Sequence, residues 1–241
     1  MNTMHSPYGF EPVEKCHTCP LRGAGFFCDL SPAALKALQA VKYTTTYPHG
    51  AVLFVEEEDP KGVFVLCRGR VKLSITSSEG KALITRIAAP GEVLGLNAAV
   101  SGKPYELTAE TLEPCQVNFV RREDFLRFLG QHGEASLRAA QQLSSRYRAA
   151  CEQIRSLGMS HSAAARLARF LLDGAAKGRD AKEAARVRMT LTHEQIGQMI
   201  GTSRETVTRT LGEFKDQRLI TRSGSTVVIQ DRTALETLVG V

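Results

Sequence analysis

Short apolar runs, several of them alternating with polar residues, follow one another between about residues 43 and 121. The runs read AVLFVE, GVFVLC, RVKLSIT, ALITRI, YELTAET and CQVNFV. Short runs rich in β-branched residues predict strands, and the segment SSEGK at 77–81 is typical of a hairpin loop. Short strands with closely spaced turns favour a sandwich or a small barrel over a parallel α/β sheet.

Helical patterns flank this region. Ser31 and Pro32 suit the N-cap and the first position of a short helix. Spacings of three and four residues begin near Arg122, predict a long helix between about residues 134 and 157, and predict an amphipathic helix at 162–173. We expect a domain boundary at 158–160, because Gly158 lies at the end of the long helix.

The long helix carries two apolar seams. The first is made of Leu137, Ala140, Ser144, Tyr147, Cys151 and Ile154. The second, beside it, is made of Leu143, Ala150 and Leu157. A helix with two seams can pack on its own domain with one and on a second copy of the chain with the other, so the first seam is a candidate dimer interface. Intramolecular packing of both seams is the alternative.

Residues 190–220 predict two short helices joined by a tight turn. Thr192 with Gln195, and Thr202 with Glu205, have the spacing of a capping box, and Gly201 lies between the helices, where unusual dihedral angles are needed. The apolar stripes are Ile196, Met199 and Ile200 in the first helix and Val207, Leu211 and Phe214 in the second. This pattern predicts a helix-turn-helix, followed by a β-hairpin wing at 219–230.

The polar face of the second helix predicts contacts with DNA. The start of this helix enters the major groove in the motif, and its candidate base-contacting residues are Thr202, Ser203, Arg204, Glu205, Thr208 and Arg209. Arginine can donate two hydrogen bonds to guanine, and glutamate can accept one from cytosine. The candidates for phosphate contacts are Lys215, Arg218 and Arg222. A solvated face with ion pairs four residues apart is the alternative.

The distribution of charge favours the same interpretation. Residues 159–241 carry 13 Lys and Arg against 9 Asp and Glu, whereas residues 1–126 carry 13 against 14. A basic C-terminal half suits a polyanionic partner such as nucleic acid. The sequence contains no secretory signal and no apolar run of about 18 residues, so we expect a cytoplasmic protein that does not enter a membrane. It also contains no Ser/His/Asp set, P-loop or paired-carboxylate motif, and we expect no enzyme.

A β-rich N-terminal region, a long central helix and the sequence TSRETVTRTL together resemble the CRP/FNR transcription regulators over about residues 30–240. The resemblance implies an α+β fold. Its parts are a cysteine-rich arm at 1–30, a jelly-roll-like β-roll at 31–126, a dimerisation helix at 127–158 and a winged helix-turn-helix at 159–241. It also implies a homodimer on a palindromic DNA site, with RNA polymerase as a partner. The pattern Glu205-x-x-Thr208-Arg209 implies a TGA core in each half-site and leaves the outer bases open.

The cysteines resemble the ligand set of the fumarate-nitrate branch of this family. Cys16, Cys19 and Cys28 precede the first helix, and Cys115 opens the last predicted strand. The resemblance implies that these four hold a [4Fe–4S] cluster whose reaction with oxygen or nitric oxide weakens dimerisation and DNA binding. Four thiolates satisfy the four irons of such a cluster. With a ligand in the roll, cluster binding would fasten the arm to the sensory domain.

Other kinds of sensory site stay open at this point. A zinc ion takes the same four thiolates, and a thiol–disulfide switch needs no metal. A cyclic nucleotide is a third possibility because GEVLG at 91–95 resembles part of a cyclic-AMP phosphate cassette, but residues 102–108 contain no Arg beside a hydroxyl to compensate a buried phosphate. Cys67 and Cys151 are interpreted as plain buried residues, since cysteine behaves as a small hydrophobe.

Overall fold

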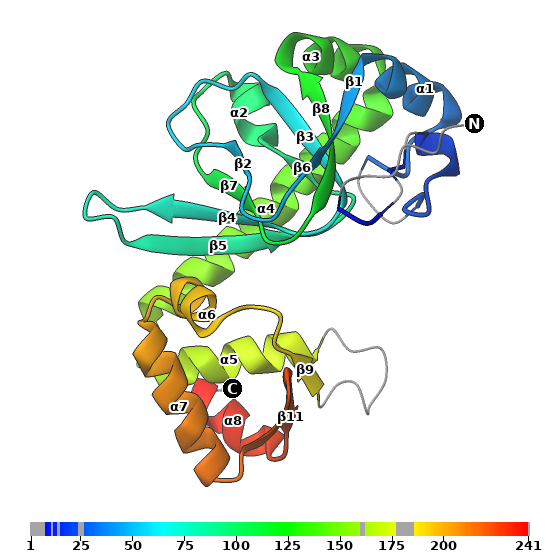
Figure 1. Cartoon of the computed structure of the whole chain (residues 1–241). Coiled ribbons are helices and arrows are strands. Elements are labelled where there is room, and N and C mark those ends of the chain that lie inside the picture. Colours follow the sequence, from blue (N-terminus) through cyan, green and yellow to red (C-terminus); the bar gives the residue numbers. More distant parts are fainter. Residues whose placement is uncertain are drawn as a thin grey trace. The chain divides into compact units, whose positions relative to one another are not determined.

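The computed structural model describes residues 8–10, 12–13, 15–23, 27–159, 162–176 and 186–240. The chain divides into two compact units, one made of 1–80 and 85–149 and the other of 81–84 and 150–241 (Figure 1). None of the helices among these described residues is both long enough and apolar enough to cross a bilayer.

Two four-stranded sheets form the β-roll of the first unit. One has the order β1 (Lys42–Tyr47), β8 (Cys115–Arg121), β3 (Gly62–Arg68) and β6 (Val93–Leu94). The other has the order β2 (Val52–Phe54), β7 (Thr108–Thr111), β4 (Val71–Thr76) and β5 (Ala82–Ala88). Each of the six predicted runs contains a strand, and the predicted α+β, jelly-roll-like fold is confirmed. The sequence KYTTTY of β1 is too polar, and β6 too short, to stand out as an apolar run.

The first sheet separates two cores. The roll interior holds Phe64 and Leu66 of β3 and Val117 of β8, together with residues of the second sheet such as Leu73. The opposite face of the first sheet presents Val63, Val65 and Val120 to helices α1 (Pro32–Val41), α3 (Arg122–Gln131) and α4 (Gly133–Met159). Because successive side chains of a strand point to opposite faces, the even residues of β3 and the odd residues of β8 face the interior.

The long helical region differs from the prediction at its start. The long helix predicted between about residues 134 and 157 is confirmed as α4, but the dimerisation region assigned to 127–158 also takes in the end of α3. His132, with a φ of −127° and a ψ of 88°, ends α3, and its N–H donates to the Phe128 carbonyl. Helix α4 then begins at Gly133 and extends to Met159. A short helix α2 (Leu96–Ser101) and a 3-10 turn η1 (Cys16–Thr18) complete the first unit. The predicted N-cap is confirmed, because the Ser31 hydroxyl accepts from the Ala34 N–H.

The two seams of α4 have different environments. Ala135, Ala139 and Gln142 are buried, and Leu143 packs against the same core. All members of the first seam are exposed except Cys151, which is half-buried; Leu137, Tyr147 and Ile154 keep 60%, 75% and 70% of their surface. A large apolar residue in water is unremarkable singly, but a row of them along one helix face suits a protein interface. The prediction that Cys151 is a plain buried residue is wrong.

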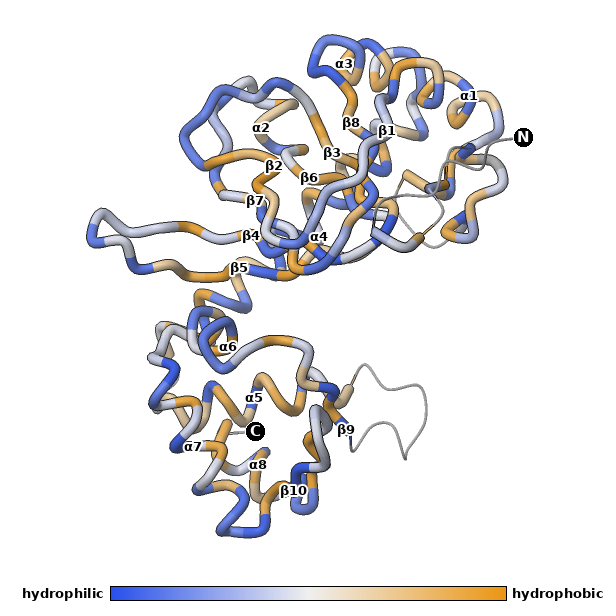
Figure 2. The backbone as a smooth tube through the Cα atoms, viewed as in Figure 1, coloured by the Kyte–Doolittle hydropathy of each residue, from blue (hydrophilic) through white to orange (hydrophobic). Residues whose placement is uncertain are grey.

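The second unit has the architecture of a winged helix-turn-helix. Its helices are α5 (Ala163–Ala175), α6 (His193–Ile200), α7 (Arg204–Asp216) and α8 (Arg232–Val239), and its sheet has the order β10 (Ile220–Ser223), β11 (Thr226–Ile229) and β9 (Arg186–Arg188). Figure 2 shows hydrophobic and hydrophilic stretches alternating along α7. Its apolar side buries Val207 and Phe214 in a core shared with Ile196 and Leu171.

One of the two predicted capping boxes is confirmed and the other is wrong. The Thr192 hydroxyl accepts from the Gln195 N–H while the Gln195 side chain accepts from the Thr192 N–H, as expected. At α7 the N-cap is Ser203, whose hydroxyl accepts from the Thr206 N–H. Thr202 belongs to the turn instead, because its N–H donates to the Gly197 carbonyl. Gly201 adopts the left-handed conformation that the turn was expected to need, with a φ of +65°.

Candidate functional site

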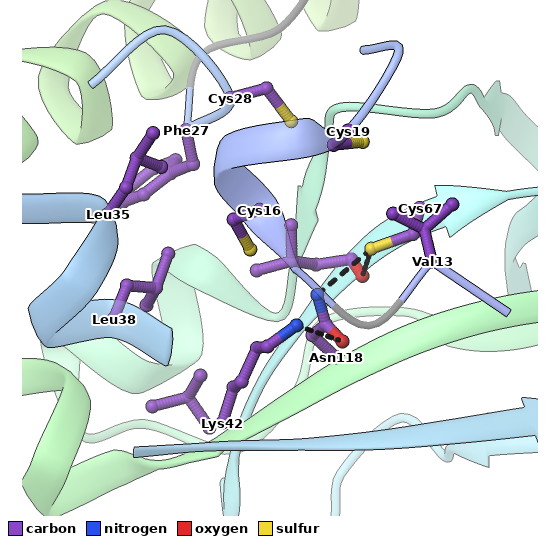
Figure 3. A pocket seen from close by; sticks show the side chains of 12 residues that line it. Val13, Cys16, Cys19, Phe27, Cys28, Leu35, Leu38, Lys42, Cys67 and Asn118 are labelled. Atoms are coloured by element: carbon purple, nitrogen blue, oxygen red, sulfur yellow. Dashed lines mark hydrogen bonds between the residues drawn. The ribbon is translucent and has the colours of Figure 1, made fainter. Parts of the chain in front are cut away.

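Four cysteines line one pocket beneath helix α1. Cys16, Cys19 and Cys28 come from the N-terminal arm, and Cys67 comes from β3 (Figure 3). The remaining walls are mostly apolar and are formed by Val13, Phe27, Leu35, Leu38, Lys42, Val65, Asn118 and Val120. All four cysteines have free thiols and are half-buried. The structure therefore brings together the three predicted arm ligands, with a fourth sulfur that the sequence did not indicate.

Cys115 is not among the residues that line this pocket. It is fully buried in the roll interior, where its Sγ lies 3.1 Å from the Glu113 carbonyl oxygen and 3.4 Å from that of Arg70. The physical reason is strand alternation: Cys115 and Val117 face the interior, so the residues of β8 on the arm side are Gln116, Asn118 and Val120. Contrary to expectation, the structure does not place Cys115 with Cys16, Cys19 and Cys28.

Cys67 faces the arm because it shares the direction of Val63 and Val65. Those two residues belong to the core beneath α1 and α3, on the outer face of the first sheet. The interpretation of Cys67 as a plain buried residue is therefore wrong. The apolar sequence VFVLC concealed this position, since a core strand reads the same way; the period of two places 63, 65 and 67 on one face but does not tell which face the arm covers.

Burial and mutual repulsion between thiolates raise the pKa of two thiols in this pocket. Burial, followed by the proximity of Cys19 and Cys16, raises the pKa of Cys28 to about 11. Burial, followed by the charge of Cys28, raises the pKa of Cys67 to about 12, although Lys42 opposes this rise. Thiols with such pKa values are protonated and neutral at pH 7. A bound metal would replace these protons and supply the positive charge that concentrated thiolates need.

The spread of the sulfurs bears on which metal group could bind. In the described part of the chain, no three Cys, His, Asp or Glu side chains are grouped as a metal-ion site requires. A single zinc ion needs all its sulfurs at about 2.3 Å, whereas a [4Fe–4S] cluster takes one thiolate on each of four irons and so spaces its ligands more widely. The cavity between the sulfurs measures ≈ 20 Å³, which is room for about one water molecule. Either metal group would require the arm to move outward from β3.

Polar groups hold the arm on the sheet around the pocket. The Val13 N–H and carbonyl form a pair of 2.7 Å hydrogen bonds with the buried Gln116 amide. The Asn118 amide donates to the Cys67 Sγ over 3.0 Å and accepts from the Thr44 hydroxyl over 2.7 Å. These contacts fix the orientation of the Asn118 side chain, so that its N–H group points at the sulfur.

The same arm is tied to helix α4. Asp29, adjacent to Cys28, forms a 2.6 Å ion pair with Arg138. The Ser31 hydroxyl donates to the Glu134 carboxylate, which also accepts from the Ser31 N–H over 3.0 Å. The pKa of Glu134 is lowered by these hydrogen bonds from Ser31. Each contact is solvent-exposed and weak singly, but together they connect the sulfur pocket to the helix that carries the exposed seam.

A second pocket of ≈ 110 Å³ lies between the β-roll and α4. Its two cations, Arg86 and Arg146, both pair with the Glu92 carboxylate at 2.5 Å. Glu106 also lines it and accepts a hydrogen bond from the Asn97 amide. An anionic ligand would therefore meet two guanidinium groups that are already paired, and a carboxylate.

The predicted base-contacting residues gather at the start of α7. Ser203, Arg204, Glu205, Thr208 and Arg209 are exposed, and Thr202 is half-buried in the turn. Arg209 makes a 3.6 Å ion pair with Glu213, but the arginine side chain remains 72% exposed. An exposed ion pair of this kind contributes little to stability, so the Arg209 guanidinium group can leave Glu213 and bind a DNA base instead. The Thr208 hydroxyl bonds to the Arg204 carbonyl and to the His193 ring.

The turn that precedes α7 is fixed by two close contacts. A Cβ on Gly197 would lie 2.8 Å from the Thr202 carbonyl oxygen, so only glycine lets the two helices approach this closely. Arg166 of α5 donates from its Nε to the Ile200 carbonyl over 2.6 Å and from its Nη2 to the Gly201 carbonyl over 3.4 Å. These bonds satisfy carbonyls that the end of α6 leaves without helical partners. No pattern in the sequence indicated this role for Arg166.

The predicted phosphate-contacting residues lie on or near the wing side of α7. Lys215, Arg218 and Arg222 are all exposed. Lys215 and Arg222 line a groove of ≈ 240 Å³ that also contains His193 and Thr208. Burial, followed by the charges of Arg222 and Arg204, lowers the pKa of His193. The positive charges are therefore concentrated around the groove beside the exposed face of α7.

Two protein families match separate parts of the chain. Residues 44–132 match the cyclic nucleotide-binding domain, and residues 165–238 match the Crp-like helix-turn-helix domain. A CRP-like cAMP-activated global transcriptional regulator of Mycobacterium tuberculosis is 27% identical over 216 residues, which cover 89% of this chain and 96% of the relative. The cAMP-activated global transcriptional regulator CRP of Salmonella typhimurium is 26% identical over 184 residues, covering 76% and 87%.

Solved structures show the same fold. FixK2 from Bradyrhizobium japonicum is similar with a TM-score of 0.70 and 25% identity, over 82% of this chain and 97% of FixK2. A CooA mutant from Carboxydothermus hydrogenoformans is similar with a TM-score of 0.71 and 21% identity, over 88% and 91%. These similarities extend over both units of the chain.

Proposed function

Because this chain belongs to the CRP/FNR family of DNA-binding transcription regulators, we propose that it senses oxygen or another redox signal through a metal group bound by its arm cysteines. With the arm moved outward from β3, the widely spaced sulfurs would suit a [4Fe–4S] cluster better than a single zinc ion, and its ligands would be Cys16, Cys19, Cys28 and a fourth thiolate from the β-roll. The observation that carries the proposal is the convergence of arm and sheet sulfurs on one apolar pocket. We expect a homodimer without enzymatic activity that acts on RNA polymerase at its promoters.

When bound, such a cluster supplies sensitivity to oxygen and nitric oxide, because its iron and sulfide react with them. The arm cysteines would hold the metal group, and the arm would therefore stay docked on the β-roll while the group is bound. Ligation by Cys28 fixes the segment that includes Asp29 and Ser31, and these residues hold Arg138 and Glu134 of α4. Loss of the metal group would release this segment, and the equilibrium would shift from the tighter dimer to the weaker one.

Helix α4 is the element on which dimerisation depends in this proposal. Its exposed seam, with Leu137, Tyr147 and Ile154, is free on the side away from the buried Ala135 and Ala139. Pairing of two seams joins two recognition helices, which can then contact half-sites about one duplex turn apart. Any change in dimer stability therefore appears as a change in DNA affinity.

Cyclic AMP is the alternative effector that the names of the relatives suggest. The pocket beside α4 disfavours it, because Arg86 and Arg146 are both paired with Glu92 and Glu106 adds a negative charge. A phosphate would have to compete with Glu92 for both guanidinium groups, although the buried Arg146 Nε is left without a hydrogen-bond partner in the described part of the chain. We therefore expect cyclic AMP to leave DNA binding unchanged.

Purification under nitrogen tests the sensory proposal. We expect about four iron and four sulfide per chain, and binding to a palindromic duplex, followed by fluorescence anisotropy, that weakens after exposure to air. A zinc-containing protein whose DNA affinity is the same before and after exposure to air would refute redox sensing. A metal-free protein that loses affinity on oxidation and regains it with dithiothreitol would indicate a thiol–disulfide switch, and a response to cyclic AMP would favour the nucleotide alternative.

DNA reading is tested separately at the recognition helix. We propose that Glu205 and Arg209 read a TGA core in each half-site. Arg209→Ala should lose discrimination at one guanine, by about 1–3 kcal/mol. Lys215→Ala is the matched control, because loss of a phosphate contact should weaken binding equally on all sequences and reduce its salt dependence. Unchanged base preference in Arg209→Ala would show that another face of α7 enters the groove.

A further inference from the structure

We propose that His193 binds a DNA phosphate and takes up a proton as it does so, with the result that DNA binding by this chain strengthens as the pH falls. His193 is the first residue of α6 and lies outside the residues that the sequence analysis assigned to DNA contacts. It lines the groove of ≈ 240 Å³ together with Lys215 and Arg222. The inference rests on the proposed placement of α7 in the major groove and is independent of the sensory proposal.

The hydrogen bonds of Thr208 determine which nitrogen of the neutral His193 ring carries the proton. The Thr208 hydroxyl donates its single hydrogen to the Arg204 carbonyl over 3.0 Å. Its oxygen lies 2.8 Å from the His193 Nδ1, and at that contact it can only accept. Nδ1 is therefore the protonated nitrogen, and Nε2 of the neutral ring carries a lone pair.

The Nε2 atom is the part of the His193 ring that is left for a ligand. Among the residues that the structure describes, Nε2 has no hydrogen-bond partner. A phosphate oxygen offers only lone pairs, so it cannot accept a hydrogen bond from Nε2 while the ring is neutral in this tautomer. Protonation of Nε2 makes the ring a charged donor, which forms the stronger kind of hydrogen bond to phosphate. Phosphate contact and proton uptake are therefore one event.

The charges around His193 keep its ring neutral before DNA binds. The cations near it are Arg204 and Lys215 of α7 and Arg222 of β10, and Glu194 follows it in α6. Burial, followed by the charges of Arg222 and Arg204, lowers the pKa of His193 from its ordinary value of 6.5. A phosphate in the groove would offset these positive charges and raise the pKa of the ring again. The difference between the two states makes DNA affinity depend on pH.

The pH dependence of DNA binding by the full chain, purified under nitrogen, tests the inference. Anisotropy titrations at constant ionic strength cover about pH 5.5 to 8.5, the range in which histidine titrates. They use a palindromic duplex with TGA half-sites and a scrambled duplex, because a phosphate contact is independent of sequence. His193→Gln removes the titrating group, and His193→Arg makes its charge permanent. His49→Gln is the matched control, since His49 is exposed between β1 and β2.

We expect the affinity of the unaltered protein and of His49→Gln for both duplexes to fall as the pH rises through this range. The fall should be about tenfold for each protomer bound, the factor that a rise of about one pKa unit on binding produces. His193→Gln should lose this dependence, and His193→Arg should keep its affinity across the range. Thr208→Val removes the acceptor from Nδ1, so the neutral ring can carry its proton on Nε2 and the pH dependence should become shallower, whatever the affinity.

Three outcomes would count against the inference. It is overturned if His193→Gln follows the same pH profile as His49→Gln while far-ultraviolet circular dichroism shows both variants folded. A flat profile in the unaltered protein overturns it as well, because the phosphate contact then needs no proton. Failure of the chain to bind either duplex overturns it together with the proposed placement of α7. Equal affinity for the two duplexes, with the pH dependence of His193 intact, contradicts only the proposed TGA core and supports the inference.

Discussion

The side chain of Gln142 closes the open edge of the first sheet, and its replacement by leucine tests how α4 is held on the β-roll. Strand β6 is the last strand of its sheet. Gln142 is 1% exposed; its amide oxygen accepts from the Val93 N–H over 3.1 Å, and its amide nitrogen donates to the Val93 carbonyl over 2.7 Å. The amide thus pairs with β6 as one residue of a further strand would.

Gln142→Leu keeps a similar volume but leaves both backbone groups of Val93 buried without a partner. Each orphaned buried group costs about 1–3 kcal/mol, and a leucine of similar size leaves little cavity. We expect the free energy of unfolding of the first unit to fall by about 2–6 kcal/mol in total. Gln141→Leu is the control: Gln141 is exposed, and a surface change of this kind costs less than about 0.5 kcal/mol.

Urea denaturation followed by circular dichroism measures the difference between the two variants. Hydrogen exchange locates it, since the segment containing Val93 should exchange faster in Gln142→Leu than in Gln141→Leu. A difference below about 0.5 kcal/mol, with unchanged exchange at Val93, would refute the reasoning. That result would mean that the edge of β6 finds other hydrogen-bond partners once the amide is removed.

Three further predictions follow from contacts described above. Gly197→Ala should destabilise the winged helix-turn-helix by about 1–2 kcal/mol, because overlap with the Thr202 carbonyl outweighs the gain in helix propensity; Gly212→Ala, with nothing within 4 Å of its Cβ, should stabilise it in the same thermal melts. Ile154→Glu should shift the expected dimer toward monomer in sedimentation equilibrium, and an unchanged dimer would contradict the assigned seam. In the metal-free protein, the free energy of unfolding measured across a pH series should fall between about pH 9 and pH 12. Folding raises the pKa of Cys28 and Cys67 from 9.0 to about 11 and about 12, so the folded form keeps protons that the unfolded chain loses, and a flat profile would contradict this.

Local patterns were sufficient for most of the secondary structure. Apolar runs located every strand of the β-roll except the polar β1 and the two-residue β6, and the side chains of Ser31 and Thr192 marked helix starts correctly. The N-cap of α7 lay one residue beyond the prediction, because Thr202 and Ser203 are equally good capping residues and the contact of Thr202 with Gly197 decided between them. When two adjacent residues are equally good N-caps, tertiary contacts decide which of them caps the helix.

The sulfur site shows a different limit. The spacing of Cys16, Cys19 and Cys28 was enough to bring them together, since they lie close in the sequence. Predicting that Cys67 and not Cys115 lies beside them required the direction of each side chain on its strand, and therefore the face of the sheet that the arm covers. An apolar run such as VFVLC gives no alternation from which to infer it, because both faces of β3 are buried.

Asp29 and Cys28 are joined by a single peptide bond, so the residue that would detect the signal and the residue that reports it to α4 move as one body. A movement of Cys28 would therefore reach α4 through Asp29, without any change in the packing of the β-roll interior. The chemistry at the sulfur could accordingly be exchanged for another kind during evolution while the report to α4 stayed the same.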